Sequence, residues 1–291
     1  MDSNHIDIPV MVADLQTSFG DTMQFESVAC CRKGRQIPGI IAKVPGRAIL
    51  PVVYPEDLPA GAQDAAGWAA QRFKDILAPP LIEPYRKRSG RERESLLSDV
   101  ILRAVSVEWS RRNPHFAHFN DAGIVGQFYL PDDENYLTEG SMHELGISIE
   151  ELRIAASQNT LARFGIILAD TSVFSSDLPQ GAILQSEPFA AASFQHDSLY
   201  LLTNGAEQGG AALMLIPQVM KVLGDLIGSD YYVVPTSTRG VLIAGKKSKF
   251  SPSVLKKTIL SENRKNAKED ALSTYIYQYD RAASGLRMLQ A

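Results

Sequence analysis

The chain has 291 residues, a formal net charge of −4 and two cysteines. A chain of this length buries roughly 75% of its unfolded surface, so neither a structural metal nor a disulfide is needed to stabilise it. The acidic balance argues against a protein that is basic throughout. Its contents of 45% hydrophobic and 21% charged residues are ordinary for a globular protein.

Cys30 and Cys31 are neighbours in the sequence. A bridge between adjacent cysteines is strained, so we expect two free thiols in a reducing compartment. The N-terminal sequence MDSNHIDIP lacks a basic segment followed by an apolar one, and no apolar stretch reaches membrane-spanning length. We therefore expect a cytoplasmic protein that is not membrane-bound.

The first eighty residues predict a lobe with the order α-β-β-β-α. Apolar residues recur at helical spacing in the first and last elements and alternate or cluster in the three between them. The expected elements are a helix at 8–19, strands at 23–30, 37–43 and 48–53, and a helix at 64–77. The charged stretch EPYRKRSGRERE predicts a linker. We thus expect an N-terminal lobe at 1–80, a linker at 81–95 and a C-terminal domain at 96–291.

The first half of the C-terminal domain contains one well-defined helix start. Ser148 and Glu151 have the spacing of a capping box, with Ile147 and Leu152 as the hydrophobic staple across it. This helix is expected to run to about Ala162. Around it we expect a helix rather than a strand at 96–109, a strand at 122–130, a short helix capped by Thr138, a strand at 164–169 and an extended loop or loose hairpin at 170–198.

The stretch 199–245 predicts the core of this domain. A strand at 199–203 is followed by a helical apolar pattern from 209 to 227, in which Pro217 either kinks the helix or marks its true start. Strands are expected at 231–234 and 241–244, a helix from Ser251-Pro252, and a last helix at 270–289. The predicted fold is α+β, with mixed or antiparallel sheets and packed helices in two lobes.

The sequence contains no recognisable catalytic pairing, and we expect no cofactor. His115 and His118 have a spacing that suits a metal with Asp121 as a third ligand. Their neighbours Phe116 and Phe119 favour a segment that enters the core instead, so no metal is expected. The GVLIAGKKS stretch places a lysine where a phosphate-binding loop needs a hydroxyl.

A second candidate site is the turn Pro235-Thr236-Ser237-Thr238-Arg239. Exposed amides and the Arg239 guanidinium suit an anion, whereas the alternative is a turn whose hydroxyls satisfy their own backbone. The candidate ligand-binding or anion-binding residues of the chain are thus His115, Asp121, Thr236, Ser237 and Arg239.

Two further features concern partners. A basic segment at 246–268 suits nucleic acid or an acidic partner, although the solvated face of a helix is the favoured interpretation. Its candidate residues are Lys246, Lys247, Lys256, Lys257, Arg264 and Lys265. On a C-terminal helix, a spacing of two residues turns side chains about 200° apart, so Tyr277 points away from Tyr275 and Tyr279. We expect Tyr277 to be exposed and to contact another protein or a second copy of this chain.

Three segments carry a family resemblance: SLYLLTNGAEQGGAALML, DYYVVPTSTRGVLI and ALSTYIYQYD. They resemble an uncharacterised bacterial family of unknown function with a Y-V-L-T-N strand, a G-A-A helix, a P-S-S turn and an L-S-x-x-V-Y-x-Y-D C-terminal helix. The turn departs from that pattern at Thr236 and at Arg239-Gly240. The resemblance implies no established activity. It implies an accessory gene of bacterial chromosomes and mobile elements, which favours a partner-binding role.

The sequence therefore predicts a non-enzymatic interaction or regulatory protein. One alternative is a small enzyme or ligand-binding protein that uses a pocket near His115, Asp121, Ser237 and Arg239. Another is a nucleic-acid accessory protein that uses residues 246–268.

Overall fold

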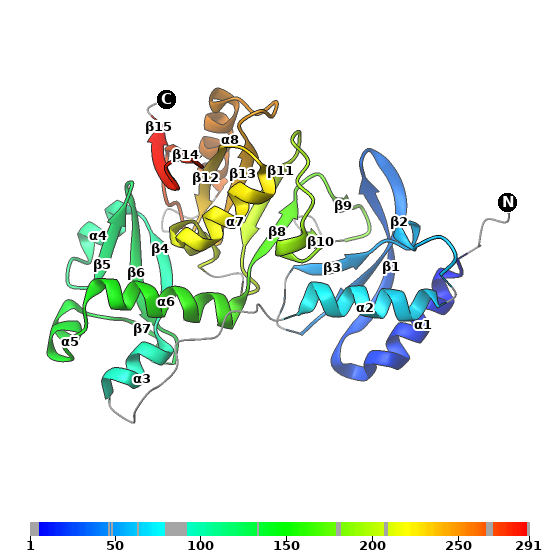
Figure 1. Cartoon of the computed structure of the whole chain (residues 1–291), viewed down its shortest axis with the longest axis horizontal. Helices are drawn as coiled ribbons and strands as arrows, with labels where there is room; N and C mark the ends of the chain where they lie inside the picture. Colours follow the sequence, from blue (N-terminus) through cyan, green and yellow to red (C-terminus); the bar gives the residue numbers. More distant parts are fainter. Residues whose placement is uncertain are drawn as a thin grey trace. The chain divides into compact units, whose positions relative to one another are not determined.

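The structure is a computed structural model with an α+β fold (Figure 1). It describes residues 6–45, 47, 49–62, 64–78, 92–132, 134–178, 182–206, 209–265 and 270–289. The chain divides into two compact units. The first comprises 1–78, 167–193 and 198–200, and the second comprises 79–166, 194–197 and 201–291. The domain predicted at 96–291 thus includes residues 167–193 and 198–200, which belong to the first unit. Of the linker expected at 81–95, residues 81–91 lie outside the described residues and the rest are helical.

The first unit contains a sheet with the strand order β10-β3-β2-β1-β9. Strands β1 (Gln24–Arg32), β2 (Arg35–Lys43) and β3 (Leu50–Val53) form an antiparallel meander. Helices α1 (Ile8–Phe19) and α2 (Ala65–Leu77) lie side by side against it (Figure 1). Their apolar sides meet the sheet in one core that includes Leu15, Ile40 and Phe73. The expected α-β-β-β-α order is confirmed.

Residues 167–193 add short strands to the same unit. These are β8 (Ile167–Asp170), β9 (Phe174–Ser175), which pairs with β1, and β10 (Leu184–Gln185), which runs parallel to β3. The single turns η1 (Gly20–Thr22), η2 (Pro55–Asp57) and η3 (Phe189–Ala191) complete the unit.

Both cysteines are unbridged, as expected. Cys30 is fully buried on β1, while Cys31 is half-buried on the other face of the strand. Burial, with a smaller contribution from the Asp177 carboxylate, raises the pKa of the Cys30 thiol to about 11.

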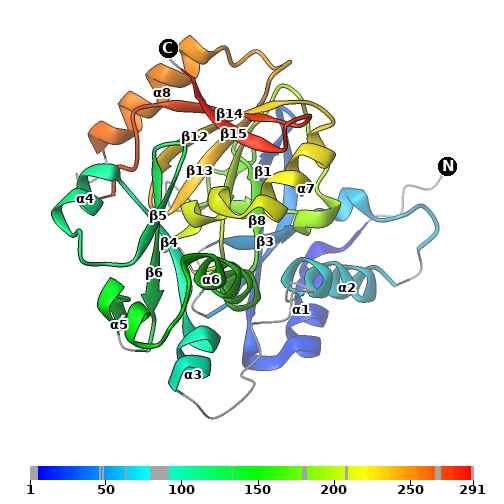
Figure 2. The same cartoon turned by 60° about the vertical axis from the view of Figure 1, so that its left-hand side comes forward.

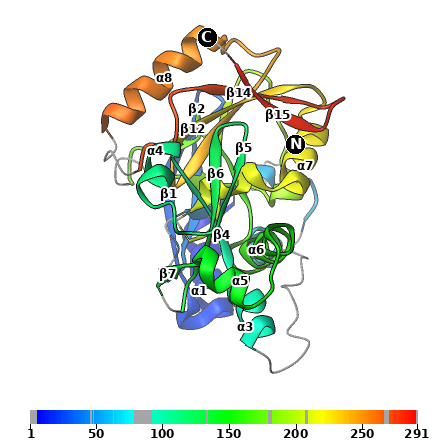
Figure 3. The same cartoon turned by 90° about the vertical axis from the view of Figure 1, so that its left-hand side faces the viewer.

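The second unit begins with an antiparallel sheet in the order β4-β6-β5, with β7 also paired to β6. Its strands are β4 (Ile101–Val105), β5 (His118–Asp121), β6 (Ile124–Leu130) and β7 (Asn135–Tyr136). Its helices are α3 (Glu92–Asp99), α4 (Val107–Arg112), α5 (Glu139–Glu144) and α6 (Ile149–Phe164). Figure 3 shows β5 and β6 as a hairpin, with α6 beside β4.

The helix expected at 96–109 is wrong, because β4 lies in its middle. Four of the five residues of β4 are buried, so the strand is covered on both faces. A strand buried in this way shows no alternation of apolar and polar residues, and its sequence cannot be told from a buried helix by period alone.

Helix α6 begins as predicted at Ser148, whose hydroxyl accepts a 3.2 Å hydrogen bond from the Glu151 amide. The second hydrogen bond of a capping box, from the Ser148 amide to the Glu151 carboxylate, was also predicted, and this prediction is wrong. The Glu151 carboxylate instead accepts hydrogen bonds of 2.5 and 2.6 Å from Arg93 on α3. One guanidinium nitrogen reaches both carboxylate oxygens, and a charge-assisted bond of this kind is stronger than a bond from a neutral backbone amide.

A second sheet includes, in this order, the strands β15-β14-β12-β13-β11. Its strands are β11 (Leu199–Thr203), β12 (Tyr231–Ser237), β13 (Gly240–Gly245), β14 (Ile276–Asp280) and β15 (Gly285–Leu289). Its helical segments are η4 (Gly210–Leu215), α7 (Pro217–Ile227) and α8 (Pro252–Lys265). Helices α7 and α8 lie on opposite sides of β12 and β14 (Figure 2). Pro217 marks the true start of α7, and Gly228 ends it with φ 72°.

The last helix expected at 270–289 is wrong, because β14 and β15 form an antiparallel hairpin there. Residues 276–279 are all buried, and Tyr277 pairs with Val233 of β12. A spacing of two places Tyr277 and Tyr279 on the same face of a strand rather than on opposite faces of a helix. Tyr277 is 0% exposed, so its predicted surface role is also wrong, whereas Tyr275 is 46% exposed.

Candidate functional site

The structure does not assemble the candidate site around the histidines. His115 is exposed and precedes β5, and its carbonyl oxygen accepts a 2.9 Å hydrogen bond from the Glu139 amide. Asp121 lies at the far end of β5, opposite Ile124. The length of the strand separates the two side chains. Among the described residues, no group of three or more His, Cys, Asp or Glu side chains is arranged to hold a metal.

The polar groups of the 236–239 turn are occupied by their own surroundings. Thr236 donates its hydroxyl proton to the Gly240 carbonyl at 3.4 Å, and the Arg239 amide donates to the Ser237 hydroxyl at 3.2 Å. The Arg239 guanidinium lies 3.8 Å from the Asp270 carboxylate. These contacts agree with the structural interpretation of the turn.

The basic segment is partly neutralised. The ammonium of Lys246 lies 3.4 Å from the Asp230 carboxylate, and that of Lys256 donates a 2.8 Å hydrogen bond to the Thr274 carbonyl. Lys247, Lys257 and Arg264 are exposed. The side chain of Lys265 lies outside the described residues.

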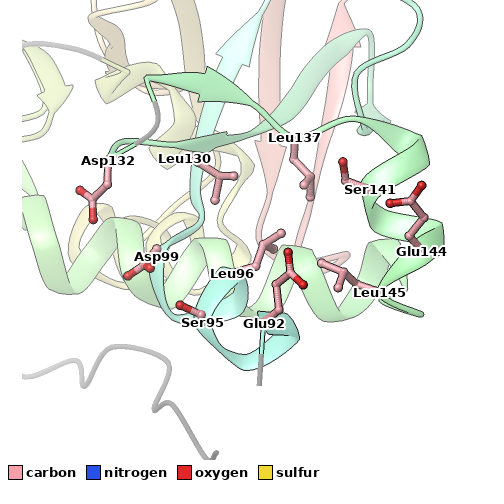
Figure 4. Close-up of a pocket in the computed structure, with 10 residues that line it drawn as sticks. All are labelled: Glu92, Ser95, Leu96, Asp99, Leu130, Asp132, Leu137, Ser141, Glu144 and Leu145. Carbon is pink, nitrogen blue, oxygen red and sulfur yellow. The ribbon is translucent and has the colours of Figure 1, made fainter. Parts of the chain in front are cut away.

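The structure shows a different candidate site, a cavity of about 570 Å³ in the second unit (Figure 4). Helix α3 forms one wall, helix α5 another, and the connection from β6 through β7 the third. We call it the acidic cavity. It is lined by Glu92, Ser95, Leu96, Asp99, Leu130, Asp132, Leu137, Ser141, Glu144 and Leu145.

Helical spacing explains why one face of α3 supplies so many of these residues. Glu92, Ser95, Leu96 and Asp99 follow one another at intervals of three, one and three, which places all four on the same side of the helix. Glu144 and Ser141 are related in the same way on α5. The sequence analysis missed the site because α3 was divided between an expected linker and the start of an expected helix.

All the charged side chains that line the acidic cavity are carboxylates. No lysine, arginine or histidine is among its described lining residues. Glu92, Asp99 and Glu144 form no ion pair with any described residue, whereas Asp132 lies 3.6 Å from the Arg163 guanidinium. Leu137 is buried, and Leu96, Leu130 and Leu145 are half-buried, so apolar surface lies between the carboxylates.

Hydrogen bonds to α6 hold α3 in place. The side-chain amide of Asn159 donates to the carbonyls of Leu97 and Val100, both at 2.9 Å. The Thr160 hydroxyl accepts a 2.8 Å bond from the Leu102 amide. Together with the Arg93–Glu151 pair, these bonds fix α3 and the start of β4 on α6, through a side of α3 that does not line the cavity. A preformed site of this kind loses less conformational entropy when a ligand binds.

The arrangement suits a ligand that is both cationic and partly apolar. A cationic group gains Coulomb energy from the separated carboxylates, and an apolar group gains from the leucines. None of the helices in the described ranges is long and apolar enough to cross a membrane.

Comparisons with known proteins show the family. No curated protein and no solved structure matches the chain. A family model, described as a family of unknown function (DUF5688), matches residues 10–281 and so spans both units. The resemblance seen in the sequence is thereby confirmed, and the chain belongs to the DUF5688 family.

Proposed function

We propose that this protein is a non-enzymatic interaction protein, and that the acidic cavity binds a positively charged, amphipathic segment of a partner protein. The observation that carries the proposal is the set of three carboxylates, Glu92, Asp99 and Glu144, that have no cationic partner among the described residues. They surround leucine side chains in a cavity of about 570 Å³. Binding clefts are commonly about 300–1,000 Å³ in volume.

The two kinds of lining residue have separate roles in this proposal. Glu92 and Glu144 are exposed, so they chiefly attract and orient a cationic partner, with an effect that weakens as salt increases. The leucines contribute most of the affinity, at about 25 cal/mol per Å² of apolar surface removed from water.

The proposal also concerns where the protein acts and which kind of gene encodes it. We propose that the protein acts in the cytoplasm of a bacterium, as a product of the chromosome or of a mobile element. The free thiols of Cys30 and Cys31 support a reducing compartment.

The test is a titration of the full chain with cationic, neutral and anionic peptides of equal length and leucine content, followed by fluorescence anisotropy. We expect the cationic peptide to bind, with an affinity that falls as salt rises. The double variant Asp99→Asn/Glu144→Gln should weaken this binding about tenfold or more. Leu96→Ala should weaken it at every salt concentration, because the loss is apolar.

A matched control is Glu139→Gln. Glu139 is exposed and lies on α5, as Glu144 does, but it does not line the acidic cavity. This variant removes the same charge from the same helix and should leave binding unchanged. Equal losses for Glu139→Gln and Glu144→Gln would reduce the effect to net charge and contradict the proposal. Equal binding of all three peptides would contradict it as well.

A further inference from the structure

A second feature of the same unit lies on the β4–β6–β5 sheet. Arg103 of β4 is paired with Gln127 of β6, and Gln127 is paired with His118 of β5. Directly opposed residues of antiparallel strands project from the same face of a sheet. The three side chains therefore form a polar row across one face, next to Tyr129, which follows two residues after Gln127 on β6.

Arg103 is held by an aromatic ring rather than by a carboxylate. Its guanidinium carbon lies 3.5 Å from the centre of the Tyr129 ring and 6.0 Å from that of Tyr136. The side chain is half-buried, and it forms no ion pair or hydrogen bond with any described residue. Arg93, Arg163 and Arg239, in the same unit, each have a carboxylate partner. Stacking leaves the donors at the edge of the guanidinium plane available.

Arg103 also lines a separate cavity of about 240 Å³, which we call the Arg103 cavity. Its other walls are mostly apolar, and Tyr129, Glu134 and Asn204 contribute further polar groups. The lining residues are Ile101, Leu102, Arg103, Tyr129, Pro131, Glu134, Phe164, Asn204 and Ala206. None of them lines the acidic cavity.

The neighbour of Arg103 in the row is an unusual buried group. Gln127 is 0% exposed, and within the described ranges neither its amide nitrogen nor its amide oxygen has a hydrogen-bond partner. A buried polar atom without a partner costs about 1–3 kcal/mol, so such groups are rare and often mark a place where another molecule contributes. Gln127, which is not itself a lining residue of the Arg103 cavity, thus places an unsatisfied amide beside an arginine that has no carboxylate partner in the described part of the chain.

We infer that the Arg103 cavity binds a small organic anion, a carboxylate or phosphate group carried on an apolar or aromatic body. The planar guanidinium matches the two oxygens of such a group and binds them together. The apolar walls favour an organic body over an inorganic ion. The exposed carboxylate of Glu134 on the same cavity disfavours ligands with a high negative charge and accommodates a ligand that also has a donor group.

The test uses the full chain and three probes: benzoate, phenyl phosphate and inorganic phosphate. Calorimetric titration should show saturable binding of at least one aromatic anion and weaker binding of inorganic phosphate. Arg103→Gln should weaken the binding about tenfold or more, because it removes a charge-assisted pair of hydrogen bonds. Arg111→Gln is the matched control, since Arg111 is an exposed arginine of α4 outside the cavity, and it should retain the wild-type affinity.

Three outcomes would overturn the inference: no saturable binding to the wild type, unchanged binding by Arg103→Gln, or inorganic phosphate that binds as tightly as both aromatic anions. If Arg103→Gln does not fold, nitrogen-15 NMR of the wild type tests whether the anion binds in the Arg103 cavity. The side-chain amide signals of Gln127 and Asn204 should shift on titration with an aromatic anion, and signals that stay in place would reject the site. Peptide binding at the acidic cavity is measured separately, so either proposal can fail without the other.

Discussion

The Arg93 guanidinium on α3 donates two hydrogen bonds, of 2.5 and 2.6 Å, to the carboxylate of Glu151 on α6. Both side chains are about one-third exposed, with values of 33% and 30%. The pair connects residues 58 apart in the sequence and holds the helix whose other face lines the acidic cavity. It thereby links the stability of α6 to the geometry of the candidate site.

A double-mutant cycle with Arg93→Ala and Glu151→Ala should give a coupling free energy of about 1 kcal/mol, because a charge-assisted, partly buried pair exceeds an ordinary surface ion pair. Urea unfolding of the four proteins measures it. The same cycle at Glu108 and Arg112 is the control, since those side chains are 75% and 72% exposed. Their coupling should not exceed about 0.5 kcal/mol. Equal couplings would show that the Arg93–Glu151 geometry adds nothing.

Gly210 should tolerate no side chain. A Cβ at this position would overlap the carbonyl oxygen of Arg239 and the hydroxyl of Thr203, which itself donates a 2.6 Å hydrogen bond to that carbonyl. Gly210→Ala should therefore cost about 2 kcal/mol or more, because backbone must move. Gly140→Ala on α5 is the comparison, since the nearest atom to its Cβ would be 3.8 Å away. We expect it to be neutral or stabilising by up to about 1 kcal/mol. An equal decrease in the urea midpoint of both variants would contradict this packing.

Tyr277 and Tyr275 should respond oppositely to truncation. Tyr277→Ala removes a fully buried ring from β14, the strand between β12 and β15, and should cost about 3–5 kcal/mol. Tyr275→Ala removes a ring that is 46% exposed and should cost less than about 1 kcal/mol. Chemical unfolding monitored by circular dichroism distinguishes them. A native-like stability of Tyr277→Ala would restore the surface role that the sequence suggested.

Cys30 should make stability fall at alkaline pH. The folded protein keeps the thiol proton up to a pKa of about 11, whereas the unfolded chain loses it near the ordinary value of 9.0. Between these values the folded state binds more protons, so its stability declines as pH rises from about 9 to 11, by on the order of 2 kcal/mol. Below pH 9 this contribution is fully present.

The measurement is the difference in unfolding free energy between the wild type and Cys30→Ala across that pH range. Taking the difference removes the tyrosines and lysines that titrate in both proteins. Cys31→Ala is the control on the same strand, and the decline should persist in it. A difference that stays constant from pH 9 to 11 would contradict the buried position of the Cys30 thiol.

Local chemistry in the sequence was sufficient for the elements that begin or end with a distinctive residue. Helix α1 ends at Gly20, α6 begins at the Ser148 cap, and α7 lies between Pro217 and Gly228. In each case the ending depends on a backbone angle or a hydrogen bond within a few residues, which the sequence specifies directly. The α+β class follows from the same signals.

Only the tertiary structure decided β4 and the β14–β15 hairpin. The residues of β4 and β14 are buried on both faces of a sheet, so the period that separates strand from helix is absent. Pairing with β6 and β12 selects the strand, and β15 is added by pairing with β14. The acidic cavity could not be predicted from the sequence for a related reason. Its residues belong to α3, α5 and the connection between β6 and β7, and α3 takes its position from contacts of Arg93 and Leu97 with a helix about sixty residues later in the chain. Local propensity determines which face of a helix is polar, but long-range packing determines what that face meets.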